Sequence, residues 1–162
     1  MKKIILILIV LTFTLSLFSV IIYVPDDYST IQAAVNAAST GDEIIVRDGT
    51  YAESITINTY GLMLHSENGS TNCTIDSPAW EEHCLEASMG VTLLEGFTFK
   101  NATNGALVFQ QGISELKNCI FEDNEKNGAP SIGGSSITAW SSFDELSGCI
   151  FKNNIGAHTV VV

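Results

Sequence analysis

Short segments in which apolar and polar residues alternate follow one another from residue 21 onward. Alternation over three or four residues is typical of β-strands that bury one face. Glycine and asparagine separate many of these segments, and both residue types tolerate the positive φ that tight turns need. The pattern predicts strands at residues 21–24, 43–46, 55–57, 62–64, 73–75, 91–93, 97–99, 106–109, 119–121, 137–139 and 149–151.

A single helix is predicted near the start, at residues 30–38. Ser29 is a suitable N-cap, and Gln32 three residues later completes a capping-box pattern. Gly41 is a suitable C-terminal stop. One narrow apolar face has helical spacing and consists of Ile31, Ala34, Val35 and Ala38. Because these residues are small, we expect the helix to lie close against a flat surface.

Three segments of the chain align on one another at Phe99, Phe121 and Phe151, which are 22 and 30 residues apart. A repeat of this length is typical of solenoids. Without helices between the strands, parallel strands are reached only by coiling, and successive coils then stack about 4.8 Å apart. The sequence therefore predicts an all-β solenoid whose first coil is covered by the helix. An antiparallel β-sandwich is the alternative, but it does not explain why the repeated segments stay in register.

The four cysteines bear on how this solenoid is held together. In the repeat alignment Cys73, Cys119 and Cys149 share one column, so Cys119 and Cys149 lie on neighbouring coils, within the Cα range of a disulfide. Their Cβ atoms point in parallel, which strains such a bond and favours buried free thiols. A disulfide between these two, or between Cys73 and Cys84, is the alternative in an exported protein.

The first 19 residues are predicted to be a secretory signal peptide. Two lysines precede an apolar run that is shorter than a membrane span needs, although an uncleaved membrane anchor is the alternative. Residues 20–162 then form the N-terminal part of a solenoid domain that is secreted or on the cell surface, with no membrane contact beyond the signal segment. Residues 158–162 are apolar and lack a polar cap, so further coils or a capping partner are expected after Val162.

The charge balance narrows the choice of partners. Seven basic residues stand against 18 acidic ones, which gives a formal charge of −11. Such a surface repels nucleic acid and anionic membranes, so neither is expected as a partner. It also repels acidic polysaccharides unless divalent cations bridge the two.

One loop, residues 76–83, concentrates chemically active side chains. Asp76, Glu81 and Glu82 offer the oxygen ligands that calcium prefers, and Trp80 offers a ring on which a sugar can stack. The alternative is a solvated acidic loop with the tryptophan packed against the coil, because calcium loops usually space their ligands at alternate residues.

Two motifs near the start carry a family resemblance: Thr-Ile-Gln-Ala-Ala at residues 30–34 and Gly-Thr-Tyr at residues 49–51. They resemble the N-terminal cap and first coil of right-handed parallel β-helix proteins of the pectate-lyase-like superfamily. The Cys-Ile-Phe-x-x-Asn units at 119–124 and 149–154 are similar to the repeats of polymorphic outer-membrane proteins. The resemblance implies an all-β, right-handed parallel β-helix (solenoid) with a short N-terminal capping α-helix.

This resemblance covers both enzymes acting on polysaccharides and adhesins without chemistry. Lyases of the fold use an arginine as base, but Arg47 is the single arginine here, and a salt bridge with Asp48 or Glu43 explains it. No facing pair of carboxylates is evident. We therefore expect a non-catalytic surface or extracellular protein that presents a rigid face for adhesion or contact with a polysaccharide or cell-surface glycan. The alternative is a carbohydrate-active enzyme whose catalytic coils are missing or diverged.

Overall fold

The computed structural model describes residues 19–79, 81–126, 136–141 and 143–156. Within these ranges the chain forms one helix and fifteen strands. Their bounds, in chain order, are β1 Ile21–Val24, α1 Ile31–Ala37, β2 Glu43–Val46, β3 Gly49–Tyr51, β4 Ile55–Ile57, β5 Met63–Ser66, β6 Cys73–Asp76, β7 Leu85–Ala87, β8 Val91–Glu95, β9 Thr98–Lys100, β10 Leu107–Phe109, β11 Ile113–Lys117, β12 Ile120–Glu122, β13 Ile137–Ala139, β14 Phe143–Ser147 and β15 Ile150–Lys152. Among these described residues no helix is long and apolar enough to cross a bilayer.

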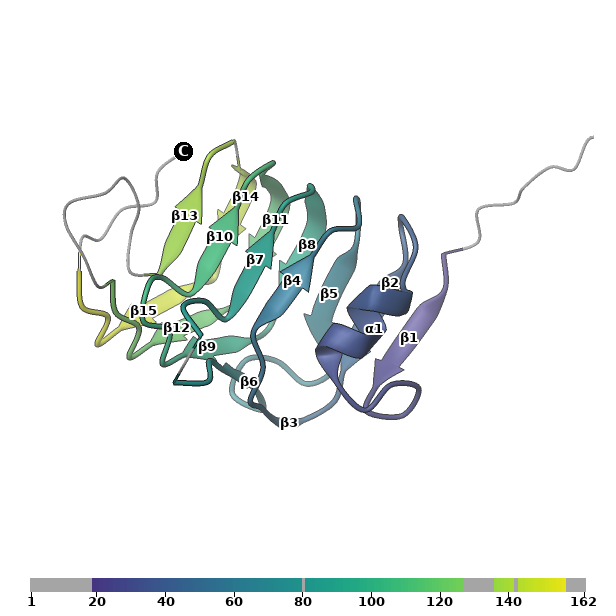
Figure 1. Cartoon of the computed structure of the whole chain (residues 1–162), viewed down its shortest axis with the longest axis horizontal. Coiled ribbons are helices and arrows are strands. Elements are labelled where there is room, and N and C mark those ends of the chain that lie inside the picture. The colour runs from purple at the N-terminus through teal and green to yellow at the C-terminus, as the bar shows by residue number, and fades with distance from the viewer. Residues whose placement is uncertain (1–18, 80, 127–135, 142, 157–162) are drawn as a thin grey trace, which may run out of the picture.

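The strands form three sheets in which all the strand pairs are parallel (Figure 1). Sheet A has the order β1-β2-β5-β8-β11-β14, sheet B the order β3-β6-β9-β12-β15, and sheet C the order β4-β7-β10-β13. From β2 onward the chain therefore passes through A, B and C in turn and returns to A. We call these passages coil 1 (β2–β4), coil 2 (β5–β7), coil 3 (β8–β10), coil 4 (β11–β13) and coil 5 (β14 and β15).

This arrangement is compatible with a β-helix or solenoid-like fold, as the repeat predicts. Parallel pairing throughout the described sheets contradicts the alternative of an antiparallel sandwich.

Four strands were not predicted from the sequence: β3, β7, β11 and β14. In β11 the buried residues Ile113 and Leu116 are three positions apart rather than two, so the alternation that marks a strand is broken there.

The aligned phenylalanines of the sequence repeat are stacked on one another inside the coils. Phe121 pairs with Phe99 on one side and with Phe151 on the other. The ring centroids lie 5.5 Å apart in the first pair and 4.9 Å apart in the second, with the rings nearly parallel. Phe99 and Phe121 are fully buried, whereas Phe151 on coil 5 is 44% exposed. The predicted register of the repeat is therefore confirmed.

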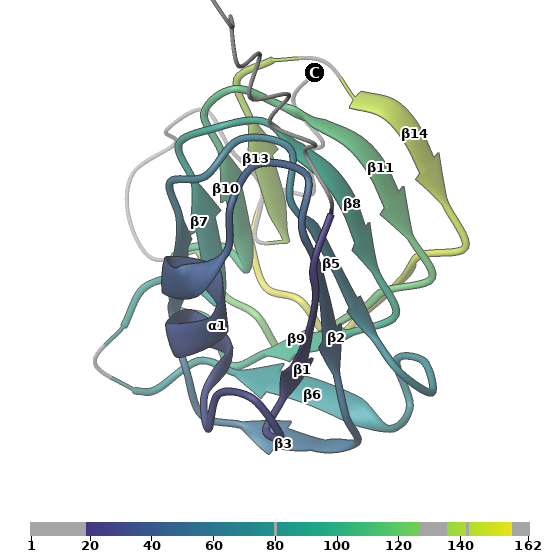
Figure 2. The same ribbon diagram turned by 90° about the vertical axis from the view of Figure 1, so that its right-hand side faces the viewer.

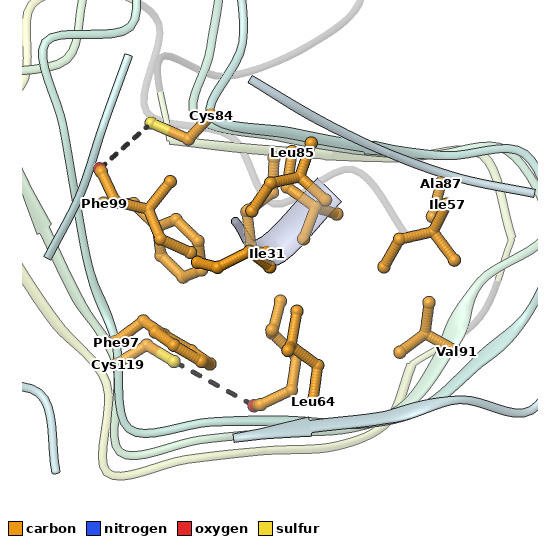
Figure 3. Packing of buried hydrophobic residues seen from close by; sticks show 14 of the residues in the cluster. Ile31, Ile57, Leu64, Cys84, Leu85, Ala87, Val91, Phe97, Phe99 and Cys119 are labelled. Atoms are coloured by element: carbon orange, nitrogen blue, oxygen red, sulfur yellow. Dashed lines mark hydrogen bonds between the residues drawn. The ribbon is translucent and has the colours of Figure 1, made fainter. Parts of the chain in front are cut away.

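Sheets A, B and C enclose one continuous apolar core (Figure 3). Leucine, isoleucine and valine line it on the side of sheet A, and aliphatic residues together with Phe109 line the side of sheet C. Phenylalanine and cysteine, with Ile75, line the side of sheet B. Helix α1 lies across the end of the stack at coil 1 (Figure 2) and buries Ile31, Ala34 and Val35 against it. Ala38 is partly buried against the same core, so the predicted apolar face of the helix is confirmed.

The two ends of α1 differ from the prediction by one to three residues. Thr30, not Ser29, is the N-cap, and its hydroxyl accepts a hydrogen bond from the Ala33 N–H at 3.1 Å. The helix ends at Ala37, because Ala38 adopts extended backbone angles. Gly41, with φ of 85°, serves the turn into β2 instead of the helix end.

A side chain of coil 1, rather than a capping box, accepts the hydrogen bonds of the first backbone N–H groups of the helix. The carboxylate of Glu53 accepts hydrogen bonds from the N–H groups of Ile31 and Gln32, at 3.0 and 2.9 Å. The Gln32 amide in turn pairs with the backbone of Thr56 on the outer edge of β4, accepting from its N–H at 2.7 Å and donating to its C=O at 3.1 Å. A side chain thus takes the place of a neighbouring strand and closes an edge that would otherwise attract another chain.

Replacing Gln32 with alanine is expected to lower the free energy of unfolding by about 1–2 kcal/mol, because two hydrogen bonds to the backbone are lost. Urea unfolding followed by circular dichroism measures the change. Gln110→Ala is the matched control, since the side chain of this exposed glutamine makes one hydrogen bond within the described residues, to Glu86. Equal losses for the two variants would contradict the edge-closing role of Gln32.

Candidate functional site

The turns that lead from sheet C back to sheet A form one corner of the stack, which we call the C–A corner. It comprises residues 58–62, 88–90, 110–112 and 140–141. Three large apolar side chains of this corner are exposed rather than buried in the core: Tyr60 is 63% exposed, Met89 40% and Trp140 74%. Because contiguous exposed apolar patches are typical of binding surfaces, we take this corner as the candidate site.

A row of glycines forms the floor of this corner. Gly90 lies level with Tyr60 of the preceding turn, since the Gly61 N–H donates to the Gly90 C=O at 2.7 Å. A Cβ atom at Gly90 would lie 3.1 Å from the Tyr60 ring. Glycine therefore lets the ring lie directly over the turn of the next coil. Gly112 continues the row, and its C=O accepts a hydrogen bond from the N–H of Val91.

A row of polar side chains borders the glycines. Ser114 in β11 lies level with Thr92 in β8 and with Asp144 in β14, because the residues on both sides of it pair across sheet A. All three are fully or partly exposed. Within the described part of the chain, no other residue forms a hydrogen bond or ion pair with these three side chains. Two hydroxyls and a carboxylate are therefore available to a ligand along three successive coils.

Together the two rows enclose a groove with a volume of about 130 Å³. It is lined by Tyr60, Gly90, Val91, Thr92, Gln111, Gly112, Ile113, Ser114 and Asp144. Closed sites for small molecules usually measure about 300–1,000 Å³, so this groove is too shallow to enclose a ligand. Its lining residues come from successive coils, so it suits a ligand that lies on the surface and extends beyond the groove.

A second hollow lies at the corner between sheets A and B and measures about 550 Å³. Its charged side chains are bound to neighbours in the protein. His65 Nε2 lies 2.7 Å from the Glu43 carboxylate, and Glu95 accepts a hydrogen bond from the Asn118 amide at 2.8 Å. No aromatic residue is among its described lining residues. This hollow therefore offers a ligand fewer free groups than the groove at the C–A corner.

The predicted calcium ligands lie between sheets B and C, away from the groove. The Asp76 carboxylate accepts a hydrogen bond from the Asn101 amide at 2.6 Å, and Glu82 accepts one from the Asn104 amide at 2.8 Å. Glu81 contacts the next coil through its backbone C=O, which accepts a hydrogen bond from the Thr103 hydroxyl.

The described residues contain no cluster of three His, Cys, Asp or Glu side chains that could hold a metal ion. Calcium binding by Asp76, Glu81 and Glu82 therefore stays a prediction without support from their placement. Trp80, the predicted sugar-stacking residue, lies outside the described residues.

Arg47 forms a salt bridge, as predicted, but with other partners. Its guanidinium lies 2.5 Å from the Asp26 carboxylate and 2.6 Å from that of Glu67, and not against Asp48 or Glu43. The parallel register explains this, because Arg47 directly follows β2, level with Glu67 after β5 and with Pro25, the residue before Asp26, after β1. The hydrogen bond from Arg47 lowers the pKa of Asp26. The pairs link three neighbouring strands on the surface.

Sequence reasoning missed the groove, although its residues carry a signal. Gly90-Val91-Thr92 and Gly112-Ile113-Ser114 have the same order of glycine, β-branched apolar residue and hydroxyl residue. Aligning these two triplets places the glycine row beside the hydroxyl row without any coordinates.

Comparison with known proteins finds no protein-family model that matches this chain and no curated protein with significant similarity to it. The likeness to pectate-lyase-like β-helices therefore rests on the motifs of the chain itself and on its three parallel sheets.

Proposed function

We propose that this chain is an exported, non-catalytic right-handed parallel β-helix protein that binds a polysaccharide or cell-surface glycan at the C–A corner. The observation that carries the proposal is the pairing of the exposed Tyr60 ring with a row of unpaired polar side chains in one groove. A sugar ring presents an apolar face of C–H groups and an edge of hydroxyls. Tyr60 suits the face, and Thr92, Ser114 and Asp144 suit the hydroxyls.

The direction of the groove favours a linear polymer. Its polar row steps from coil to coil, with a rise of about 4.8 Å at each step. This rise is similar to the length of one sugar unit in an extended chain, so successive units can meet equivalent positions on successive coils. Trp140, which is 74% exposed in the turn between coils 4 and 5, extends the same corner beyond the groove.

Charge favours a neutral polymer over an acidic one. The groove lining contains the carboxylate of Asp144 and no lysine or arginine. The chain as a whole carries a formal charge of −11. An acidic polysaccharide would meet repulsion here that a neutral one avoids.

Binding explains this groove better than hydrolysis does. Glycoside hydrolysis generally needs two carboxyl groups about 5–9.5 Å apart on either side of the scissile bond. The groove lining offers one, Asp144. A lone carboxylate can still accept hydrogen bonds from sugar hydroxyls, which serves binding.

Replacing Tyr60 with alanine is expected to weaken binding to a neutral polysaccharide about tenfold, or ~1.4 kcal/mol, which is within the gain from burying one aromatic face. The residue 20–162 protein is tested by affinity electrophoresis against a panel of neutral and acidic polysaccharides, and the best ligand is then measured by calorimetry. Asp144→Asn is expected to keep binding to the neutral ligand, because the amide still forms hydrogen bonds.

Tyr28→Ala is the matched control, since Tyr28 is also an exposed tyrosine, at 38%, but lies beside β1 and α1. It is expected to leave affinity unchanged. If no polysaccharide in the panel binds, or if Tyr28→Ala and Tyr60→Ala weaken binding equally, the proposal is wrong.

A further inference from the structure

Cys119 and Cys149 occupy equivalent positions in coils 4 and 5, each one residue before a strand of sheet B. Ile120 pairs with Ile150, and the Ile150 N–H donates to the Cys119 C=O at 2.8 Å. The two cysteines are therefore direct neighbours across parallel strands, about 4.8 Å apart, which is inside the Cα range of a disulfide. Cys73 has no such partner, because its neighbour in β3 is Gly49. All four cysteines are free thiols in the structure.

The two neighbouring thiols have unlike environments. Cys119 is fully buried, and burial raises its pKa well above the usual range. Cys149 is partly exposed, and a hydrogen bond from the Cys119 thiol lowers its pKa to about 7. Burial raises the pKa of Cys73 and of Cys84 to about 12. Near neutral pH the thiolate, which is the reactive form, therefore resides mainly on Cys149.

The position of β15 at the end of sheet B allows the small shift that a Cys119–Cys149 disulfide needs. Neighbouring Cβ atoms on parallel strands are about as far apart as the strands, ~4.8 Å, whereas a disulfide needs Cβ atoms about 3.5–4.5 Å apart. Closing this difference requires a small shift of β15 toward β12. β15 is the outermost described strand of sheet B, and Ile150 and Phe151 in it are 54% and 44% exposed. It therefore moves with less loss of packing than an inner strand.

We propose that Cys119 and Cys149 are a redox pair whose disulfide fastens coil 5 to coil 4 when a disulfide oxidant is present. The Cys149 thiolate attacks one sulfur of oxidised glutathione, forms a mixed disulfide and releases one glutathione thiolate. Cys119 then loses its proton to solvent, and its sulfur attacks the Cys149 sulfur and releases the second glutathione thiolate. The two cysteines lose two electrons, which oxidised glutathione takes up. This proposal does not depend on glycan binding.

The test uses the reduced residue 20–162 protein, incubated with oxidised glutathione at pH 8, quenched by alkylation and digested for mass spectrometry. The expected product is a cross-linked peptide containing Cys119 and Cys149, with Cys73 and Cys84 alkylated as free thiols. The initial rate of thiol consumption is expected to rise as pH increases through about 7, because the Cys149 thiolate forms over that range.

Two variants separate the steps. Cys119→Ser is expected to stop at the mixed disulfide on Cys149, and Cys149→Ser to leave Cys119 unmodified. Thermal unfolding with and without dithiothreitol gives an independent readout, because the oxidised wild-type protein should melt higher than the reduced one and Cys149→Ser should show no difference. A mixed disulfide that persists in the wild-type protein without the Cys119–Cys149 cross-link would overturn the proposal, as would a cross-link through Cys84.

Discussion

Replacing Phe121 with alanine is expected to reduce the free energy of unfolding by about 3–5 kcal/mol. The Phe121 ring is fully buried and stacks between Phe99 and Phe151, with centroids 5.5 and 4.9 Å away. Its removal leaves a cavity inside the stack and takes one partner from each neighbouring ring. Because coils pack only on adjacent coils, the loss interrupts coupling between coils 3 and 5. Urea denaturation followed by circular dichroism and by tryptophan fluorescence measures both the loss and any separation of the two transitions.

Phe151→Ala is the matched control, since this phenylalanine has the same position in the repeat but is 44% exposed. Among the described residues its ring stacks on one phenylalanine rather than two, so its truncation is expected to lower the free energy of unfolding by less than half as much as that of Phe121. Equal losses for the two variants would contradict the prediction and show that the outer side of coil 5 is covered in solution.

The stacked phenylalanines were predictable because the repeat places like residues in one column. Phe99, Phe121 and Phe151 each follow a leucine by five positions, so the sequence alone sets which residues become neighbours. Most strands were predicted in the same way, from the alternation of apolar and polar residues, although β7 was missed despite this alternation. In β11 the alternation itself is broken, because the buried Ile113 and Leu116 are separated by two residues instead of one.

Contacts between coils were not predictable from local pattern. By residue type Ser29 is the better N-cap and Thr30 also a suitable one, and nothing nearby in the sequence indicates that Glu53 receives the first N–H groups of the helix. The partners of Arg47 are likewise about 20 residues away on either side. Sequence reasoning chose close neighbours in the chain because the register of coils 1 and 2 was not yet known.

The groove illustrates the same limit for function. Thr92, Ser114 and Asp144 are each unremarkable hydroxyl or acidic residues in the sequence, and they form a row only after the coils stack. The loop around Asp76 and Glu82 instead drew notice because its acidic residues are close in the chain. In the structure each of these two carboxylates binds an asparagine of the next coil. In a solenoid, functional groups gather by register rather than by proximity in sequence.

Replacing Asn124 with alanine is expected to lower the free energy of unfolding by about 2–6 kcal/mol, because two buried backbone groups lose their partners at roughly 1–3 kcal/mol each. Asn124 is fully buried at the corner between sheets B and C. Its Oδ1 accepts a hydrogen bond from the Ala102 N–H, and its Nδ2 donates to the Phe99 C=O, each at 3.0 Å. Nδ2 also donates to Oδ1 of Asn154 on the next coil. Differential scanning calorimetry and urea denaturation measure the loss.

Asn154→Ala is the matched control, because Asn154 occupies the equivalent position one coil further along the stack. Asn154 is only partly buried, and its amide donates to the Phe121 C=O at 2.9 Å. Water can replace some of the hydrogen bonds that the truncation removes. We therefore expect the free energy of unfolding to fall by less than half as much as in Asn124→Ala. Equal losses would show that the amides contribute by filling space rather than by satisfying buried backbone groups.

Asn124→Asp tests the direction of the hydrogen bonds with almost no change in shape. An ionised carboxylate would face the Phe99 C=O and Asn154 Oδ1, both acceptors, in a buried site. Burial and these acceptors raise the folded-state pKa of the new carboxyl above its unfolded value of about 3.9. The folded state then binds the proton more tightly, so the loss relative to wild type is smallest below about pH 4 and grows as pH rises toward the folded-state pKa. A loss of unfolding free energy that does not depend on pH would contradict the prediction. It would mean that solvent reaches the side chain at position 124 and that the site is not buried within the stack.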